Sequence, residues 1–188
     1  MKPEIVVDEQ MIRNVQSKLV GFEKKAPVAI SSALNRAMAS VTKQITVETR
    51  SRYHIKAKDV RATLTKTKAN RSNISAIVVS SGKTIPLDRF IVTPRTVQPR
   101  RKKPILVAVK KGGKKPLPGA FVGDIQGIKV FKRKTNRRLP IGRMFGPSVP
   151  QMLKGRDIQS EINKAGRDMF YKRLDHEINR ILSKGAVS

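Results

Sequence analysis

The stretch from residue 110 to residue 153 constrains the fold more than any other part of the sequence. It reads KKGGKKPLPGAFVGDIQGIKVFKRKTNRRLPIGRMFGPSVPQML, with two short apolar runs, 120–122 and 128–131, set between Lys/Arg clusters and Pro or Gly corners. Proline fixes φ and lacks a backbone donor, so the five prolines of this stretch disfavour a helix. Gly112 and Gly113 allow a sharp turn. The pattern predicts a small antiparallel sheet with basic loops.

Amphipathic patterns flank this stretch on both sides. On the N-terminal side apolar residues recur at steps of three and four, which predicts a long amphipathic helix to about Arg52. Gly21 and Pro27 indicate a break or kink in it near residues 24–27. A short strand over residues 4–7 and an N-cap at Asp8 precede it. From Asp157 a second helical pattern runs to about Ser183. The apolar positions are Met11, Ile12, Val15, Leu19, Phe22, Ile30, Leu34, Ala37, Met38, Val41 and Ile45 in the first pattern, and Ile158, Ile162, Met169, Leu174, Ile178 and Ile181 in the second.

These patterns together predict an α+β fold. We expect a long kinked N-terminal helix, a small antiparallel β-sheet with long basic loops, and a C-terminal helix that packs on the sheet. We expect one domain over residues 1–188. Its parts are an N-terminal helical region (1–55), a basic β-region (56–150) and a C-terminal helix (151–188). Within the β-region, the Pro-rich segments 94–104 and 139–150 are expected to form extended arms.

The charge of the chain limits its possible partners. Lys and Arg number 41 against 13 Asp and Glu, a formal net charge of +28. Such a protein repels itself unless a polyanion, an acidic protein or an assembly neutralises it. With six Phe, two Tyr and no Trp, the chain has few rings on which bases could stack. Any nucleic-acid contact is therefore expected at the phosphate backbone, without sequence readout.

The positive charge is densest in the loops of the predicted sheet. Between Arg95 and Arg138 there are fifteen Lys and Arg but only one acid, Asp124. Two interpretations stay open at this stage: the loops contact anionic material, or they are solvated loops that keep the protein soluble. The candidate contacts with DNA or with an acidic partner are Arg100, Arg101, Lys102, Lys103, Lys110, Lys111, Lys114, Lys115, Lys132, Arg133, Lys134, Arg137 and Arg138.

The sequence offers no pattern typical of catalysis. It contains no cysteine, and His176 between Asp175 and Glu177 is a poor metal site because adjacent helical residues point about 100° apart. KKGGKK lacks the spacing of a phosphate-binding loop. Asp88 and Asp124 are the only acids between residues 60 and 156, too few to hold two magnesium ions. We therefore expect no enzyme, no cofactor and no catalytic or metal-binding residue.

The sequence also gives no indication of a membrane protein. The first residues lack the pattern of a signal peptide, and no apolar run approaches the ~20 residues of a membrane span. The expectation is a soluble protein made in the cytoplasm.

Four passages carry a resemblance to a known family. They are SSALNRAM (31–38), RSRYHIKAKDVR (50–61), KKGGKKPLPGAFVG (110–123) and RRLPIGRMFGPSVPQML (137–153). Together they resemble the minor tail protein Z family of tailed bacteriophages and prophages. The resemblance implies a non-enzymatic structural role, as a tail-completion or neck component at the head–tail junction. It implies no catalytic residues.

The resemblance also implies partners and a location. The protein is expected to form a homo-oligomer, with a ring as the expected arrangement. Its expected partners are the phage tail terminator, head-completion or connector proteins, and double-stranded DNA in the tail channel. Its expected location is the virion, after synthesis in the host bacterial cytoplasm. No membrane is implied. Whether the basic loops contact DNA or acidic faces of neighbouring subunits stays open. The alternative function is a stand-alone basic nucleic-acid-binding protein without sequence specificity, since high charge and Pro/Gly-rich arms suit both.

Overall fold

A computed structural model of the 188-residue chain describes residue 7 and residues 9–185. The predicted strand over residues 4–7, except Val7, and the predicted N-cap Asp8 lie outside the described residues. The chain divides into two compact units. Unit 1 comprises Met1–Glu48, Thr63–Ser81 and Leu153–Ser188, and unit 2 comprises Thr49–Ala62 and Gly82–Met152. That the chain acts as a single domain stays a prediction.

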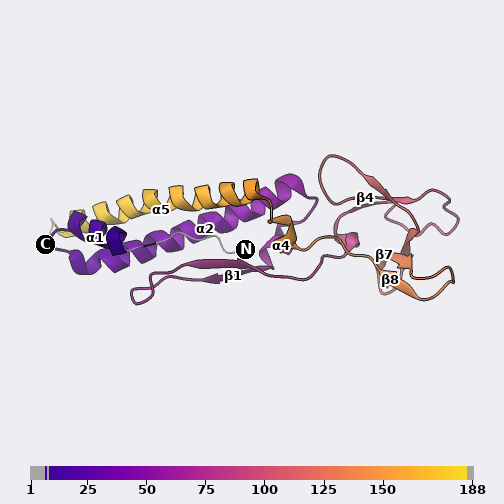
Figure 1. The fold of residues 1–188 in the computed structure, drawn as a ribbon, viewed down its shortest axis with the longest axis horizontal. Coiled ribbons are helices and arrows are strands. Elements are labelled where there is room, and N and C mark those ends of the chain that lie inside the picture. The colour runs from indigo at the N-terminus through magenta and orange to yellow at the C-terminus, as the bar shows by residue number, and fades with distance from the viewer. Residues whose placement is uncertain (1–6, 8, 186–188) are drawn as a thin grey trace. The chain divides into compact units, whose positions relative to one another are not determined.

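Helices dominate unit 1, and the two longest run side by side (Figure 1). The first helical pattern forms two helices with a single turn of 3₁₀ helix (η1) between them, so the predicted interruption is a full break rather than a kink. The helical elements of unit 1 are α1 (Glu9–Lys18), η1 (Glu23–Lys25), α2 (Ala26–Arg52), whose last turn belongs to unit 2, and α5 (Arg156–Gly185).

The break has a local cause. Gly21 adopts φ = +80°, a left-handed conformation that L side chains disfavour, and its N–H donates to the carboxylate of Glu23 at 2.8 Å. The backbone N–H groups of Glu23 itself and then of Gly21 lower the pKa of that exposed carboxyl group. Pro27 stands in the first turn of α2, where its missing N–H has no helical partner to lose.

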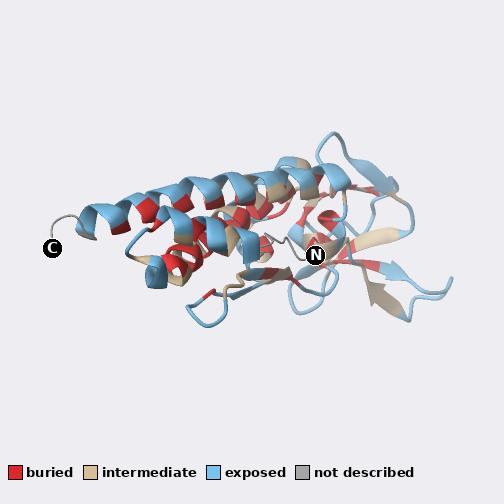
Figure 2. Ribbon diagram, turned by 60° about the vertical axis from the view of Figure 1, so that its left-hand side comes forward, coloured by how far each residue is buried: buried red, intermediate tan, exposed pale blue. Residues whose placement is uncertain are grey.

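The core of unit 1 lies where the helices face one another (Figure 2). Ala29, Ala33 and Ala37 of α2 are fully buried in one hydrophobic cluster with Phe170 and Leu174 of α5. Small side chains allow two helices to approach closely, and the large Phe170 fills the space that they leave. Within unit 1 the helix that packs on this small-residue face of α2 is α5.

A two-stranded antiparallel hairpin completes unit 1. Strands β1 (Leu64–Thr67) and β2 (Ile77–Ser80) are paired, and Ala69 from the loop between them is buried in the helical core. The amide of Asn35 on α2 bonds this loop twice: it donates to the Ala69 carbonyl at 2.9 Å and accepts from the Ala69 N–H at 2.9 Å. One polar side chain therefore satisfies both backbone groups of a buried residue.

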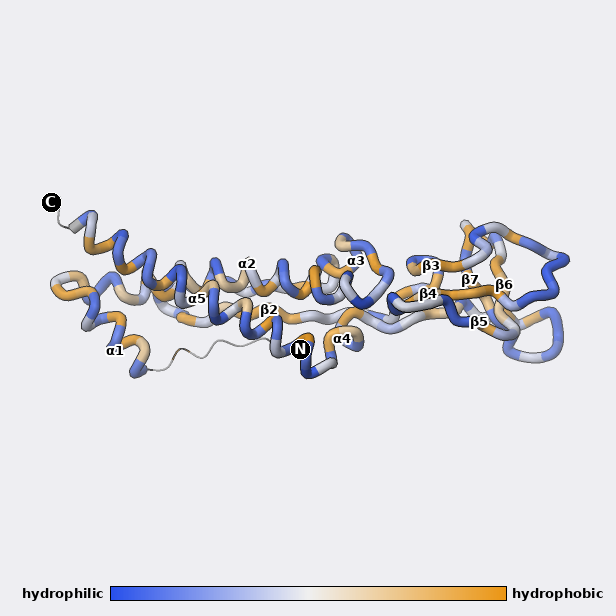
Figure 3. The backbone as a smooth tube through the Cα atoms, turned by 90° about the horizontal axis from the view of Figure 1, so that it is seen from above, coloured by the Kyte–Doolittle hydropathy of each residue, from blue (hydrophilic) through white to orange (hydrophobic). Residues whose placement is uncertain are grey.

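Unit 2 contains two three-stranded antiparallel sheets, ordered β3-β4-β5 and β6-β7-β8. Figure 3 shows that its hydrophobic strands are joined by hydrophilic loops. The elements are α3 (Ala57–Arg61), η2 (Leu87–Arg89), β3 (Ile91–Thr93), β4 (Ile105–Ala108), β5 (Lys115–Leu117), β6 (Ala120–Asp124), β7 (Ile128–Arg133), β8 (Ile141–Arg143) and α4 (Val149–Met152).

The predicted α+β class is confirmed, although the strands form three small antiparallel sheets rather than one. Of the predicted arm over 139–150, residues 141–143 form strand β8 and residues 149 and 150 begin helix α4. Beyond β8, Met144 N–H donates to the Val130 carbonyl at 2.8 Å and Gly146 N–H to the Ile85 carbonyl at 2.7 Å. The segment is therefore part of unit 2. The other predicted arm, 94–104, is the loop that joins the paired strands β3 and β4.

Candidate basic interface

Unit 2 carries most of the net charge of the chain. Its residues 49–62 and 82–152 contain 23 Lys and Arg but only three acids, which gives +20 of the +28 formal charge. Composition alone does not reveal this separation, because unit 2 is assembled from two parts of the sequence. The positive charge of the chain is thus concentrated on unit 2.

Each of the three acids already has a partner inside unit 2. Asp59 accepts from the Arg89 guanidinium at 2.9 Å, and both oxygens of Asp88 accept from Arg143 at 2.9 and 3.0 Å. Asp124 accepts from the Gly127 N–H at 3.2 Å in the turn between β6 and β7. These acids hold η2, β8 and a turn in place. They leave the basic loops without internal counter-ions.

All thirteen candidate contacts from the sequence are exposed, and none forms an ion pair with a described acid. They occupy three connections between paired strands. Arg100–Lys103 lie in the β3–β4 loop and Lys110–Lys114 in the β4–β5 loop, with Lys115 opening β5. The remaining residues close β7 and enter the β7–β8 loop. Arg101 is partly engaged, because its guanidinium donates to Gln98 and to the carbonyls of Lys103 and Pro104.

The structure does not bring these loops into one site. In an antiparallel sheet the loops before and after a strand lie at its opposite ends, so residues 94–104 and 109–114 flank β4 on opposite sides. At the first end, Arg101, Lys102 and Lys103 line a hollow of about 750 Å³ together with Arg133 from β7 and Phe121 from β6. We call it the basic hollow. The Arg133 guanidinium lies 6.0 Å from the centre of the Phe121 ring.

At the other end the four lysines border a different concavity. Lys110, Lys111, Lys114 and Lys115 line a groove of about 800 Å³, which we call the lysine groove, and the four lysines are called its rim. The rest of its lining is mainly apolar and is called its floor; it is formed chiefly by Tyr53, Val107, Val109, Pro116, Met144 and Phe145.

The base of the lysine loop is fixed by backbone hydrogen bonds. His54 N–H donates to the Val109 carbonyl at 2.9 Å and Lys111 N–H to the Arg52 carbonyl at 2.8 Å, while Gly112 and Gly113 take positive φ at the tip. The Gly-Gly pair therefore turns the chain as predicted, and the residues after α2 hold its ends.

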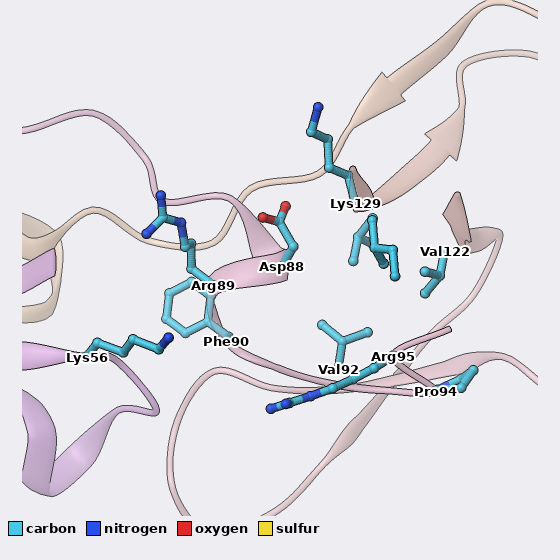
Figure 4. A pocket seen from close by; sticks show the side chains of 11 residues that line it. Lys56, Asp88, Arg89, Phe90, Val92, Pro94, Arg95, Val122 and Lys129 are labelled. Carbon is cyan, nitrogen blue, oxygen red and sulfur yellow. The ribbon is translucent and has the colours of Figure 1, made fainter. Parts of the chain in front are cut away.

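Sequence reasoning missed the uncharged members of these surfaces. Tyr53 and Phe145 join the lysine groove from segments far apart in the chain. Both lie in passages that carry the family resemblance, but nothing in those passages indicates that the two side chains meet. A third hollow, of about 360 Å³, contains Lys56, Arg89 and Arg95 beside Asp88 (Figure 4). Arg89 is already bound to Asp59. The charge there is thus partly neutralised, unlike that of the two other surfaces.

The two acids on either side of His176 are engaged with other residues. On α5, Asp175 pairs with Lys18 at 4.0 Å, whereas Glu177 points inward and accepts from the Ser32 hydroxyl at 2.9 Å. Across residue 7 and residues 9–185, no three His, Cys, Asp or Glu side chains are grouped so that they could hold a metal ion. Within the same residues no helix is both long and apolar enough to cross a bilayer.

An α+β chain that displays hydrogen-bond donors and positive charge on exposed hairpin loops is equipped to bind anionic surfaces. Comparison with known proteins identifies the family to which this chain belongs. The chain belongs to the prophage minor tail protein Z (GPZ) family, whose model matches residues 9–184. This confirms the resemblance seen in the sequence and makes the chain a member of a phage minor tail protein family. Searches of curated proteins and of solved structures gave no significant match.

Proposed function

We propose that this protein is a non-enzymatic structural component of the virion, a tail-completion or neck protein at the head–tail junction. It helps to join head and tail and to position the DNA end in the tail channel. The observation that carries the proposal is the concentration of +20 charge in unit 2, with thirteen of its 23 Lys and Arg exposed on or beside hairpin loops, in a member of a phage minor tail protein family.

Duplex DNA is the polyanion that such a location offers. It carries one negative charge per about 1.7 Å of axis, and proteins that neutralise its phosphates need no base contacts. The β3–β4 and β7–β8 loops suit this task, because Lys102, Lys103, Arg137 and Arg138 are exposed and their side chains have no bond to another described residue. A ring of several copies would surround the duplex with such tips, and the DNA would offset the mutual repulsion of the subunits.

Electron microscopy of particles made without this protein tests the proposal. We expect separate heads and tails if the protein joins the two halves, or joined but non-infectious particles if it acts mainly on the DNA end. Intact and fully infectious particles would overturn the proposal. They would instead favour the stand-alone nucleic-acid-binding protein.

A binding measurement tests the DNA contact itself. Affinity for a duplex of arbitrary sequence is expected to fall log-linearly with salt, with a slope of about 0.9 per phosphate contact. The quadruple variant K102Q/K103Q/R137Q/R138Q, called the hairpin-tip variant below, is expected to reduce that slope by about 3–4. An unchanged slope, with the variant folded by circular dichroism, would show that these tips do not contact DNA.

A further inference from the structure

We infer that the lysine groove is a docking site for an acidic peptide segment of a partner protein, one that carries at least one large apolar side chain. The inference rests on the proposed function, because it names the chemistry of a neighbour in the assembled tail. It also separates two roles that the sequence left joined: the β3–β4 and β7–β8 loops contact DNA, and the lysine groove contacts protein.

The exposed apolar floor of the groove favours a protein partner. Phe145 is 48% exposed although it is a large aromatic residue, and it lies in the groove beside Met144 and Pro147. Phosphate contacts require donors but no apolar surface, whereas a peptide side chain that covers Phe145 removes apolar area from water. A rim of charge around an apolar floor is the arrangement that protein-binding surfaces share.

The four lysines of the rim favour an acidic partner. The four lysines are exposed and have no described acid as partner, and the Lys110 ammonium lies 6.0 Å from the centre of the Tyr53 ring. Lysine ammonium groups act as mobile point charges that pair with carboxylates without a fixed geometry. Acidic residues on either side of an apolar anchor would meet the rim while the anchor meets the floor.

The size of the groove and the charge of unit 2 argue against two other occupants, duplex DNA and a second copy of the chain. The groove measures about 800 Å³, within the ~300–1,000 Å³ of concave sites that enclose a small ligand or a few side chains. A duplex is a convex rod with a major groove about 12 Å wide, so it contacts projecting loops more readily than such a floor. A second copy of unit 2 is disfavoured by its +20 charge and by its three engaged acids.

The test compares two charge-matched variants of the full chain. The groove variant K110Q/K111Q/K114Q/K115Q and the hairpin-tip variant each remove four positive charges. Lys102 and Lys103 precede β4 at the end opposite to the groove lysines, and Arg137 and Arg138 lie in the β7–β8 loop. The probes are a fluorescent Asp/Glu-rich peptide with a central Leu-Phe pair, the same peptide with Ser-Ser at the centre, and a duplex DNA. Phe145→Ser forms a third variant, which changes the floor and no charge.

The inference makes four linked expectations. The Leu-Phe peptide binds the unaltered protein at least about 10-fold more tightly than the Ser-Ser peptide, a gap of about 1.4 kcal/mol. The groove variant and Phe145→Ser each weaken its binding about 10-fold or more, whereas the hairpin-tip variant changes it less than about 3-fold. Phe145→Ser leaves DNA affinity unchanged, since it removes no charge.

Three results would overturn the inference. Equal binding of the two peptides would reduce the groove to a charged surface, and equal loss in both quadruple variants would show attraction by net charge alone. Loss of DNA affinity confined to the groove variant would assign the groove to DNA. Because purified protein is used, failure here leaves the particle test of the proposed function untouched. Separate heads and tails could still accompany a groove that binds no peptide.

Discussion

At the scale of single residues, the periodicity of α2 gives the most direct test. Leu34 is 2% exposed, whereas Ala39 lies on the exposed face of the same helix. We predict that Leu34→Asp lowers the free energy of unfolding by about 3 kcal/mol or more, because it buries an unpaired charge and removes apolar contacts. Ala39→Asp is the control and is expected to stay within about 0.5 kcal/mol. Urea denaturation measures both, and equal effects would show that the buried face is wrongly assigned.

Glycine is required at position 146 because a side chain there would clash with a neighbouring ring, and not because its φ angle is positive. A Cβ atom at this position would lie 2.8 Å from Cε2 of Phe90, which is itself 4% exposed and cannot move freely. We predict that Gly146→Ala destabilises the protein by about 1–3 kcal/mol through overpacking. Gly142→Ala is the control, since its nearest neighbour is the flexible end of the Lys134 side chain at 3.3 Å.

Recovery of stability in a Gly146→Ala/Phe90→Leu double variant would identify the ring as the cause of the strain. If the double variant is as unstable as the sum of both single changes, the contact with Phe90 is not responsible.

At the scale of elements, the β1–β2 hairpin depends on one side chain of α2. Asn35 makes two hydrogen bonds to the backbone of buried Ala69, each 2.9 Å long. We predict that Asn35→Ala costs about 2–4 kcal/mol, because it leaves a buried donor and a buried acceptor without partners. Asn35→Asp keeps the acceptor and loses the donor.

Hydrogen exchange locates the loss. The amides of β1 and β2 are expected to exchange faster in Asn35→Ala, while those of β7 keep their protection. Uniformly faster exchange in all strands would contradict a local role for Asn35.

At the scale of the whole molecule, the distribution of charge predicts a response to salt. The net charge of +20 destabilises the folded state of unit 2, because its Lys and Arg side chains repel one another. At 0.1 M salt this repulsion is screened beyond about 10 Å. We predict that raising NaCl from about 0.02 M to about 0.5 M increases the melting temperature, by about 2–4 °C for each kcal/mol gained. The groove variant should show a smaller increase. A melting temperature that falls with salt would contradict the argument.

The way the chain is threaded predicts how it unfolds. The chain passes between the two units four times, and one of these boundaries falls inside α2. Melting of one unit therefore releases several connections of the other at once, and we predict a single calorimetric transition with equal calorimetric and van't Hoff enthalpies. Two separate transitions would show that the units are independent domains.

The sequence by itself determined the elements that depend on local patterns. The steps of three and four in α2 and α5, the break around Gly21 and the apolar run of β7 were all predicted, because each follows from the side chains within a few turns. The family was also recognisable from local passages. By contrast, β5 was missed because Pro116 marked it as a turn, although an edge strand tolerates proline opposite Leu106.

Only the tertiary structure decided how the charge is arranged. The pairing of Arg143 with Asp88, 55 residues apart, leaves the loops without acids, and the order of strands places Lys102 and Lys111 at opposite ends of β4. Tyr53 and Phe145 line the same lysine groove because the tertiary structure brings two distant segments of the chain together. Local propensity specifies a strand but not its neighbour, so a sequence that shows thirteen exposed cations cannot show that they form separate surfaces.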